Sequence, residues 1–238
     1  MVVNPYFFRL PGPRLQSRFK MLDLIPLQEI STLAIWIPLV LAGLRWKTGG
    51  RKLRLFFVFL LFGAITDGLG WASYKIWDFD WLDSLATYVQ FFYLWFEALF
   101  FIWLAYEFYR IPSRAFWIKV LCGISSLVFV VDAFNRFGPL VHNRAFSSFV
   151  YSGVLVLSSF LMAFALLRIA EQKEEIMKEP WFWILSGIFF YSFSVFFVDI
   201  LAFSEIAQEL WKIRVIFNMI QYVFFVVGLL KFSMNNKQ

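Results

Sequence analysis

The sequence predicts an all-α, polytopic membrane protein: a bundle of seven transmembrane helices with the N-terminus outside and the C-terminus inside. Three observations support this fold class: the composition, seven long apolar segments, and the placement of the basic residues. Of the 238 residues, 61% are hydrophobic and 22% aromatic, and the mean hydropathy is +0.70. Soluble domains are about 45–50% apolar even when glycine is counted, so this composition favours a membrane protein.

The composition also argues against several other classes of protein. A single cysteine, Cys122, excludes an intrachain disulfide and a multi-cysteine metal site. The formal charge of +6 is spread over short loops, where basic residues set membrane topology rather than bind nucleic acid. No glycine-rich phosphate loop, nucleophile elbow or HExxH motif occurs. We therefore expect no cofactor, no metal and no nucleic-acid partner, and no motif identifies an enzymatic reaction.

Residues 1–23 are expected to form a basic lead that does not cross the membrane. The lead contains prolines and four basic residues, and it lacks the apolar run and small-residue cleavage site of a signal peptide. Two interpretations stay open: an arm on the membrane surface, or translation that starts at Met21, so that residues 1–20 are not native. Residues 24–232 are expected to form one transmembrane domain, and residues 233–238 a cytoplasmic tail.

Seven apolar segments reach the roughly 20 residues that a bilayer core requires. In chain order they are Leu24–Leu44, Leu53–Tyr74, Tyr88–Tyr109, Ala115–Phe134, Phe146–Leu167, Trp181–Phe203 and Leu210–Phe232. Pro38 should kink the first, because proline removes a helix hydrogen bond, whereas Pro180 precedes the sixth as a favourable first-turn residue. Residues 168–179 are expected to extend the fifth helix into water, with an ion pair between Glu174 and Lys178.

Basic residues concentrate in the loops on one side of these segments, and this distribution predicts the orientation. The loop at 45–54 carries five of them, and the loops near 110–119 and 168–178 and the C-terminal tail carry most of the others. By the positive-inside rule this side is cytoplasmic. The four basic residues of the lead argue for the opposite orientation.

Polar residues within the apolar segments define the candidate site. They are Asp67, Gln90, Glu97, Asp199, Arg214, Asn218 and Gln221. Glu97 lies near the centre of the third segment, where a charge costs about 3 kcal/mol on insertion scales. Gln90 and Tyr93 share its helix face, and Arg214, Asn218 and Gln221 follow the i, i+4, i+7 spacing of one stripe. These positions predict an outward-facing polar cavity with Glu97 at its floor.

Several details of that cavity are left as alternatives. Asp199 and Arg214 are expected either to form a buried ion pair or to be hydrated separately, with the arginine reaching the headgroups. Glu97 is expected to hydrogen-bond Gln221 or Asn218. The whole set can also be read as a structural network that holds helices together. Asp132 is expected at a helix end, facing outer water.

Three stretches resemble an uncharacterised group of small seven-helix bacterial inner-membrane proteins that are often associated with sensor kinases. The stretches are FFYLWFEALFF, WFWILSGIFFYSFSVFF and LWKIRVIFNMIQYVFFVVGLL. The matching positions are Trp183, Ile184, Ser186, Gly187, Trp211, Ile213 and Asn218. Arg214 stands where the resemblance would place a histidine. The resemblance implies a sensory or accessory role in the inner (plasma) membrane.

The function expected from the sequence is that of a membrane sensor or accessory subunit. It would have the lipid bilayer around it and a membrane or cytoplasmic signalling partner, because the loops are too short for an output domain. Two alternatives stay open: a small-solute or proton-coupled transporter, and an intramembrane lipid-modifying enzyme that uses Asp67 and Asp199. A rhodopsin is excluded, because residues 215–230 contain no lysine to form a Schiff base.

Overall fold

The computed structural model describes residues 26–47, 49–76, 79–109, 113–138, 143–201 and 207–235, with a few side chains at the ends of these ranges excepted. All regular elements in these ranges are helices, and no β-strand occurs in them. The elements are α2 (Leu27–Ala34), α3 (Trp36–Leu44), α4 (Gly50–Lys75), α5 (Asp80–Tyr106), α6 (Arg114–Phe137), α7 (Arg144–Gln172), η2 (Ile176–Lys178), α8 (Pro180–Leu201) and α9 (Ala207–Asn235).

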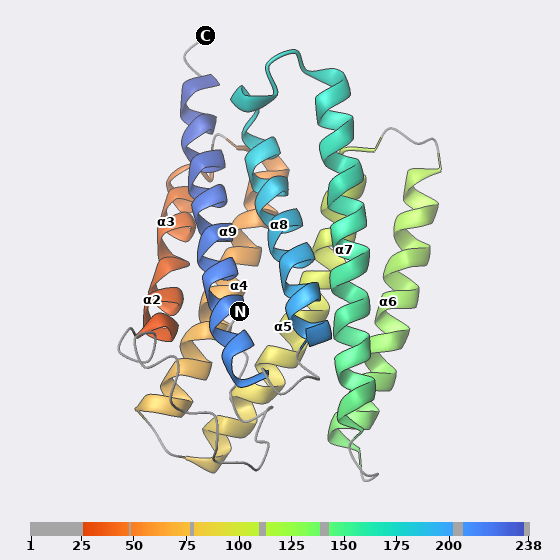
Figure 1. The fold of residues 1–238 in the computed structure, drawn as a ribbon. Helices are drawn as coiled ribbons and strands as arrows, with labels where there is room; N and C mark the ends of the chain where they lie inside the picture. The colour runs from red at the N-terminus through yellow and green to blue at the C-terminus, as the bar shows by residue number, and fades with distance from the viewer. Residues whose placement is uncertain are drawn as a thin grey trace.

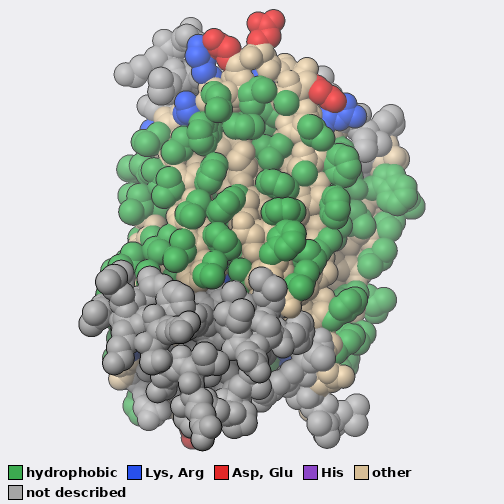
Figure 2. Space-filling model, viewed as in Figure 1, with side chains coloured by type: hydrophobic (Ala, Val, Ile, Leu, Met, Phe, Trp, Pro, Cys, Tyr) green, Lys and Arg blue, Asp and Glu red, His purple; other side chains and the backbone are tan. Residues whose placement is uncertain are grey.

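Seven helical stretches are long and apolar enough to cross a membrane, which confirms the predicted fold class apart from its orientation. Figure 1 shows them side by side, with α2 and α3 at one edge of the bundle and α6 at the opposite edge. The C-terminal ends of α3, α7 and α9 lie at the same end of the bundle, so the basic loops of the sequence gather there. Figure 2 shows an apolar belt over the side of the bundle, with charged side chains above it at this end.

The first transmembrane span consists of two helices. Between α2 and α3 the regular helix is interrupted at Ile35, three residues before the kink expected at Pro38. Pro38 is the third residue of α3, a position whose N–H would have no partner within that helix. The backbone N–H of Leu39 donates to the carbonyl of Ile35 at 3.2 Å. Ile35 keeps helical backbone angles (φ −64°, ψ −25°), so the interruption is one residue long and lies where Pro38, which has no N–H, fails to bond the carbonyl four residues earlier.

Two other helix boundaries differ from the apolar segments. Helix α5 begins at Asp80 rather than at Tyr88, with Asp80 and Asp83 in its first turn, where acidic side chains favour the positive end of the helix dipole. Hydropathy alone overlooks such a polar first turn. Helix α7 ends at Gln172 and the 3-10 turn η2 follows.

Because α7 ends at Gln172, the ion pair expected between Glu174 and Lys178 on a continued α-helix does not form. Lys178 pairs with Glu175 at 2.6 Å instead of with Glu174. A 3-10 turn brings positions i and i+3 onto the same face, whereas an α-helix would have favoured i and i+4.

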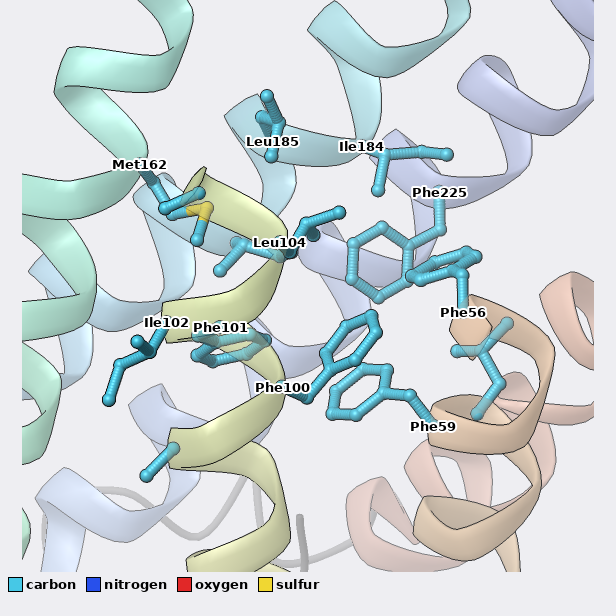
Figure 3. Packing of buried hydrophobic residues seen from close by; sticks show 14 of the residues in the cluster. Phe56, Phe59, Phe100, Phe101, Ile102, Leu104, Met162, Ile184, Leu185 and Phe225 are labelled. Carbon is cyan, nitrogen blue, oxygen red and sulfur yellow. The ribbon is translucent and has the colours of Figure 1, made fainter. Parts of the chain in front are cut away.

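An aromatic core fills the end of the bundle that carries the basic loops. Phe56 and Phe59 of α4 meet Phe100 and Phe101 of α5 and Phe225 of α9, as Figure 3 shows. The Phe59 and Phe100 rings stack with centroids 4.7 Å apart, and the Phe56 and Phe225 rings meet edge to face at 5.0 Å. On α5, Phe100 and Phe101 follow Glu97 by three and four residues, so the aromatic core packs directly beside the polar site on that side.

Helices α8 and α9 make the most extensive helix contact in the structure, and two glycines permit it. A Cβ atom at Gly187 would lie 2.8 Å from Phe224 Cβ, and one at Gly228 would lie 2.8 Å from Ile184 Cγ1 and from the Pro180 carbonyl oxygen. Small residues at such crossings let membrane helices approach closely. This contact fixes the rotation of α9, and with it the direction of the α9 polar stripe.

Candidate functional site

A chain of buried polar contacts joins α2, α4 and α9. The Asn218 side-chain amide donates to Ser31 Oγ at 3.2 Å and to the Tyr222 hydroxyl at 3.1 Å. The Tyr222 hydroxyl in turn donates to Asp67 Oδ2 at 3.5 Å. All four side chains are at most 5% exposed. Because buried polar groups are costly unless they are hydrogen-bonded, this chain holds the three helices in register.

Glu97 of α5 lies in the same cluster and is 5% exposed. Within the part of the chain that the structure describes, its carboxylate makes no hydrogen bond or ion pair. It lies within electrostatic range of Arg214 and Asp67 and of the tyrosines Tyr93, Tyr191 and Tyr222. The hydrogen bond expected from Glu97 to Asn218 or Gln221 is not formed; the side-chain NH2 group of Asn218 donates to Ser31 and Tyr222.

Tyr93 lies on the same face of α5 as Glu97 and packs against α4, the helix that carries Asp67. Tyr93 and Glu97 are separated by four residues on α5, and Gly63 and Asp67 by four residues on α4, so each pair lies on one helix face. The Tyr93 hydroxyl oxygen would lie 3.1 Å from a Cβ atom at Gly63, which places it against the α4 backbone. Tyr93 is 5% exposed, and its hydroxyl makes no hydrogen bond within the described residues.

Arg214 supplies the positive charge of the cluster. It is 8% exposed, donates a hydrogen bond to the Tyr151 hydroxyl of α7, and has its guanidinium carbon 4.9 Å from the centre of that ring. Tyr191 of α8 interacts with both Arg214 and Tyr151. The predicted ion pair between Arg214 and Asp199 stays a prediction, because the Asp199 side chain lies outside the described residues.

The structure brings most of the predicted site residues together. Asp67, Glu97, Arg214, Asn218 and Gln221 are all buried, whereas Gln90 is only partly buried on α5. The sequence reasoning missed Ser31, Tyr151, Tyr191 and Tyr222. Of these, only Tyr222 had a local signal, since it follows Asn218 by four residues and continues the α9 stripe.

A second polar cluster, which the sequence reasoning did not identify, joins α6 to α7. Asp132 does not face water as expected: it is 1% exposed, pairs with Arg136 Nε at 2.7 Å, and accepts a hydrogen bond from Ser147. Asn135 donates to Ser147 Oγ and to the Asn143 carbonyl, each at 3.0 Å. The reason is the tight return of α7 beside α6, which covers the carboxylate that a single helix would have left exposed.

These observations define the class of the protein: a multi-pass, all-α membrane protein whose bundle encloses a polar cluster. Comparison with protein-family models, with curated proteins and with solved structures found no match to this chain. The resemblance to a group of inner-membrane proteins therefore stays a prediction. Among the described residues, no three His, Cys, Asp or Glu side chains lie together in a way that could hold a metal ion.

Proposed function

We propose that this protein is a sensor or accessory subunit of a bacterial inner membrane, with the N-terminus outside and the C-terminus in the cytoplasm. Its central polar cluster would respond to a small polar ligand or a proton and pass a helix movement to a membrane or cytoplasmic partner. The observation that supports this most directly is the Glu97 carboxylate, which is buried without a hydrogen bond in the described part of the chain. Ionisable groups inside a membrane are costly and usually functional.

The connectivity of the cluster supports a signalling role. Its side chains come from α2, α4, α5, α7, α8 and α9, so a change of charge or occupancy at Glu97 acts on most of the bundle. Buried polar contacts have discrete arrangements, and a ligand that favours one of them shifts the helices toward it. The connections between the described helices are short, so the response would be read out by a second protein.

A chromosomal Glu97→Gln exchange in the source bacterium tests this proposal. The amide keeps the shape of the side chain but cannot carry its charge. We expect normal protein abundance, unchanged co-purification of membrane partners, and the same phenotype as a deletion of the gene. The matched control is Asp132→Asn, which neutralises a carboxylate that is equally buried but already paired, and which should retain the phenotype of the wild type. Full function of the Glu97→Gln variant would overturn the proposal.

One observation favours a transporter as the second candidate. The regular helix of the first span is interrupted for one residue at Ile35, one turn from Ser31, and Ser31 contacts Asn218 of α9 at 3.2 Å. Discontinuous helices form the binding sites of many secondary transporters. Proteoliposomes that contain the purified protein distinguish the two candidates, because only a transporter would produce cation or solute flux that depends on Glu97.

A further inference from the structure

The turn between α3 and α4 carries a surplus of positive charge at the edge of the apolar belt. Five basic residues lie between positions 45 and 54, and the sequence has no acidic residue between Glu29 and Asp67. Figure 1 places this turn at the end of the bundle where α7 and α9 also finish, and Figure 2 shows Lys and Arg side chains at the rim of the apolar belt there. The neighbouring sequence therefore offers this positive charge no acidic partner.

Three of the five basic residues have no partner among the described residues. Lys47, Arg51 and Arg54 are exposed, and within the described part of the chain they take part in no hydrogen bond, ion pair or ring contact. Arg51 and Arg54 are three positions apart near the start of α4, so they share one helix face, and Lys47 precedes them in the turn. We call these three residues the basic patch. The other two basic residues, Arg45 and Lys52, are only partly exposed and interact within the protein.

A second turn at the same end of the bundle has its charges balanced within the chain. Each basic residue from position 168 to 178 pairs there with an acidic one: Arg168 with Glu171 at 2.8 Å, Lys173 with Glu179 at 3.6 Å, and Lys178 with Glu175 at 2.6 Å. Exposure alone therefore does not leave a basic side chain unpaired at this end of the bundle. The basic patch differs because its own surroundings supply no acid, which leaves its charge for a partner outside the chain.

The position of the patch on α4 adds to this electrostatic conflict. Helix α4 begins at Gly50 with no acidic residue in its first turn and no side-chain hydrogen bond at its cap. The N-terminal end of a helix is the positive end of its dipole, so the charge of Arg51 is unfavourable there. Helix α5, by contrast, begins with Asp80 and Asp83. A negatively charged group bound at the basic patch would remove the conflict.

Trp46 sets the basic patch at the level of the lipid headgroups. Its side chain, next to Lys47, is 39% exposed, and its ring packs edge-on against Phe57 of α4 with the centroids 5.0 Å apart. Tryptophan side chains that are apolar on one side and wet on the other collect at the membrane–water interface. The Gly49 N–H donates to the Arg45 carbonyl at 3.1 Å, which holds the backbone of the turn. The patch therefore lies at the depth where lipid phosphates lie.

We propose that the basic patch binds the headgroup of an anionic phospholipid. The lipid phosphate is the negative group that a bilayer places at this depth, and arginine binds phosphate oxygens through two parallel N–H groups. Clusters of basic residues directly beyond a membrane helix attract anionic lipids. This inference goes beyond the function proposed for the central cluster and uses none of its residues.

Native mass spectrometry of the purified full-length protein in detergent tests the inference. Phosphatidylglycerol and phosphatidylcholine with the same acyl chains are titrated onto the protein, and their dissociation constants are compared. Each basic residue near a lipid surface contributes about a fivefold gain in affinity for an anionic lipid, so the three residues of the patch should give a preference for phosphatidylglycerol of up to about 100-fold. Equal affinity for the two lipids would overturn the inference.

Three paired substitutions show whether the preference belongs to the basic patch. Arg51→Gln with Arg54→Gln removes two charges of the patch and should reduce the preference about 25-fold. The matched control, Arg168→Gln with Lys178→Gln, removes two positive charges from paired residues at the same end of the bundle and should keep the preference of the wild type. An equal loss in both would show that net charge alone attracts the lipid and would overturn a site at the patch. Arg51→Lys with Arg54→Lys keeps the charge and should retain most of the preference; its loss there would refute binding by charge.

Two competitors identify the source of the bound anion. Inorganic phosphate or polyglutamate is added to the lipid-bound protein, the protein is isolated again, and the lipid that stays bound is counted. We expect neither to displace the lipid, because the acyl chains keep its headgroup at the depth of the patch. Displacement by phosphate would assign the patch to a free anion, and displacement by polyglutamate would assign it to an acidic protein; either result would overturn lipid binding.

Discussion

The contact between α8 and α9 gives the sharpest test of the packing. In Gly228→Ala, the new methyl group would lie 2.8 Å from Ile184 Cγ1 and 2.8 Å from the Pro180 carbonyl oxygen. The isoleucine side chain can move, but the carbonyl belongs to the backbone of the neighbouring helix. Overpacking of this kind costs about 1–3 kcal/mol, while replacing a helical glycine by alanine returns about 1 kcal/mol. The variant should therefore be destabilised by up to about 2 kcal/mol.

A second glycine provides the matched control for this substitution. Gly153 lies within α7 and is exposed, and a Cβ atom there would meet nothing within 4 Å. Gly153→Ala should gain the same helix propensity without the clash, so it should be more stable than the wild type by about 0.5–1 kcal/mol. The difference between the two alanine variants thus isolates the packing cost of about 1–3 kcal/mol.

Equilibrium unfolding of both variants in the same detergent measures this difference. Thermal unfolding in lipid nanodiscs gives an independent ranking. If Gly228→Ala were as stable as Gly153→Ala, α8 and α9 would not approach each other as closely as described. The rotation of α9, and therefore the position of its polar stripe, would then have to be reconsidered.

Three further predictions concern the polar clusters and the orientation. Arg136→Gln should destabilise by about 3–5 kcal/mol, because it leaves the buried Asp132 without its cation; adding Asp132→Asn should restore part of the loss, and strictly additive losses would show that the pair is not coupled. Tyr222→Phe should cost about 1–3 kcal/mol in unfolding free energy, because the acceptor of the Asn218 amide and the donor to Asp67 disappear together; an unchanged unfolding curve would contradict the chain of contacts. In a protein without Cys122, Thr48→Cys should react with a membrane-impermeant thiol reagent only after the cells are opened, and Asp80→Cys in intact cells; the reverse pattern would invert the proposed orientation.

The sequence by itself determined the seven membrane spans and most of the residues of the site. A bilayer core leaves no water for the backbone, so each span must be a helix of sufficient length and hydrophobicity. That requirement is local and can be read from composition, as can the polar positions that interrupt it. Glu97, Asp67 and Asn218 stand out for this reason, because each is a costly exception within an apolar helix.

The tertiary structure alone decided which of these groups meet. Hydropathy does not specify how far each helix rotates about its axis, and this rotation depends on close contacts between helices, such as those at Gly187 and Gly228. For the same reason Asn218 faces Ser31 and Tyr222 rather than Glu97, and Tyr151 of α7 becomes the partner of Arg214. Asp132 is buried because α7 returns beside it. Contacts between residues far apart in the chain depend on packing, which the pattern along a single helix does not encode.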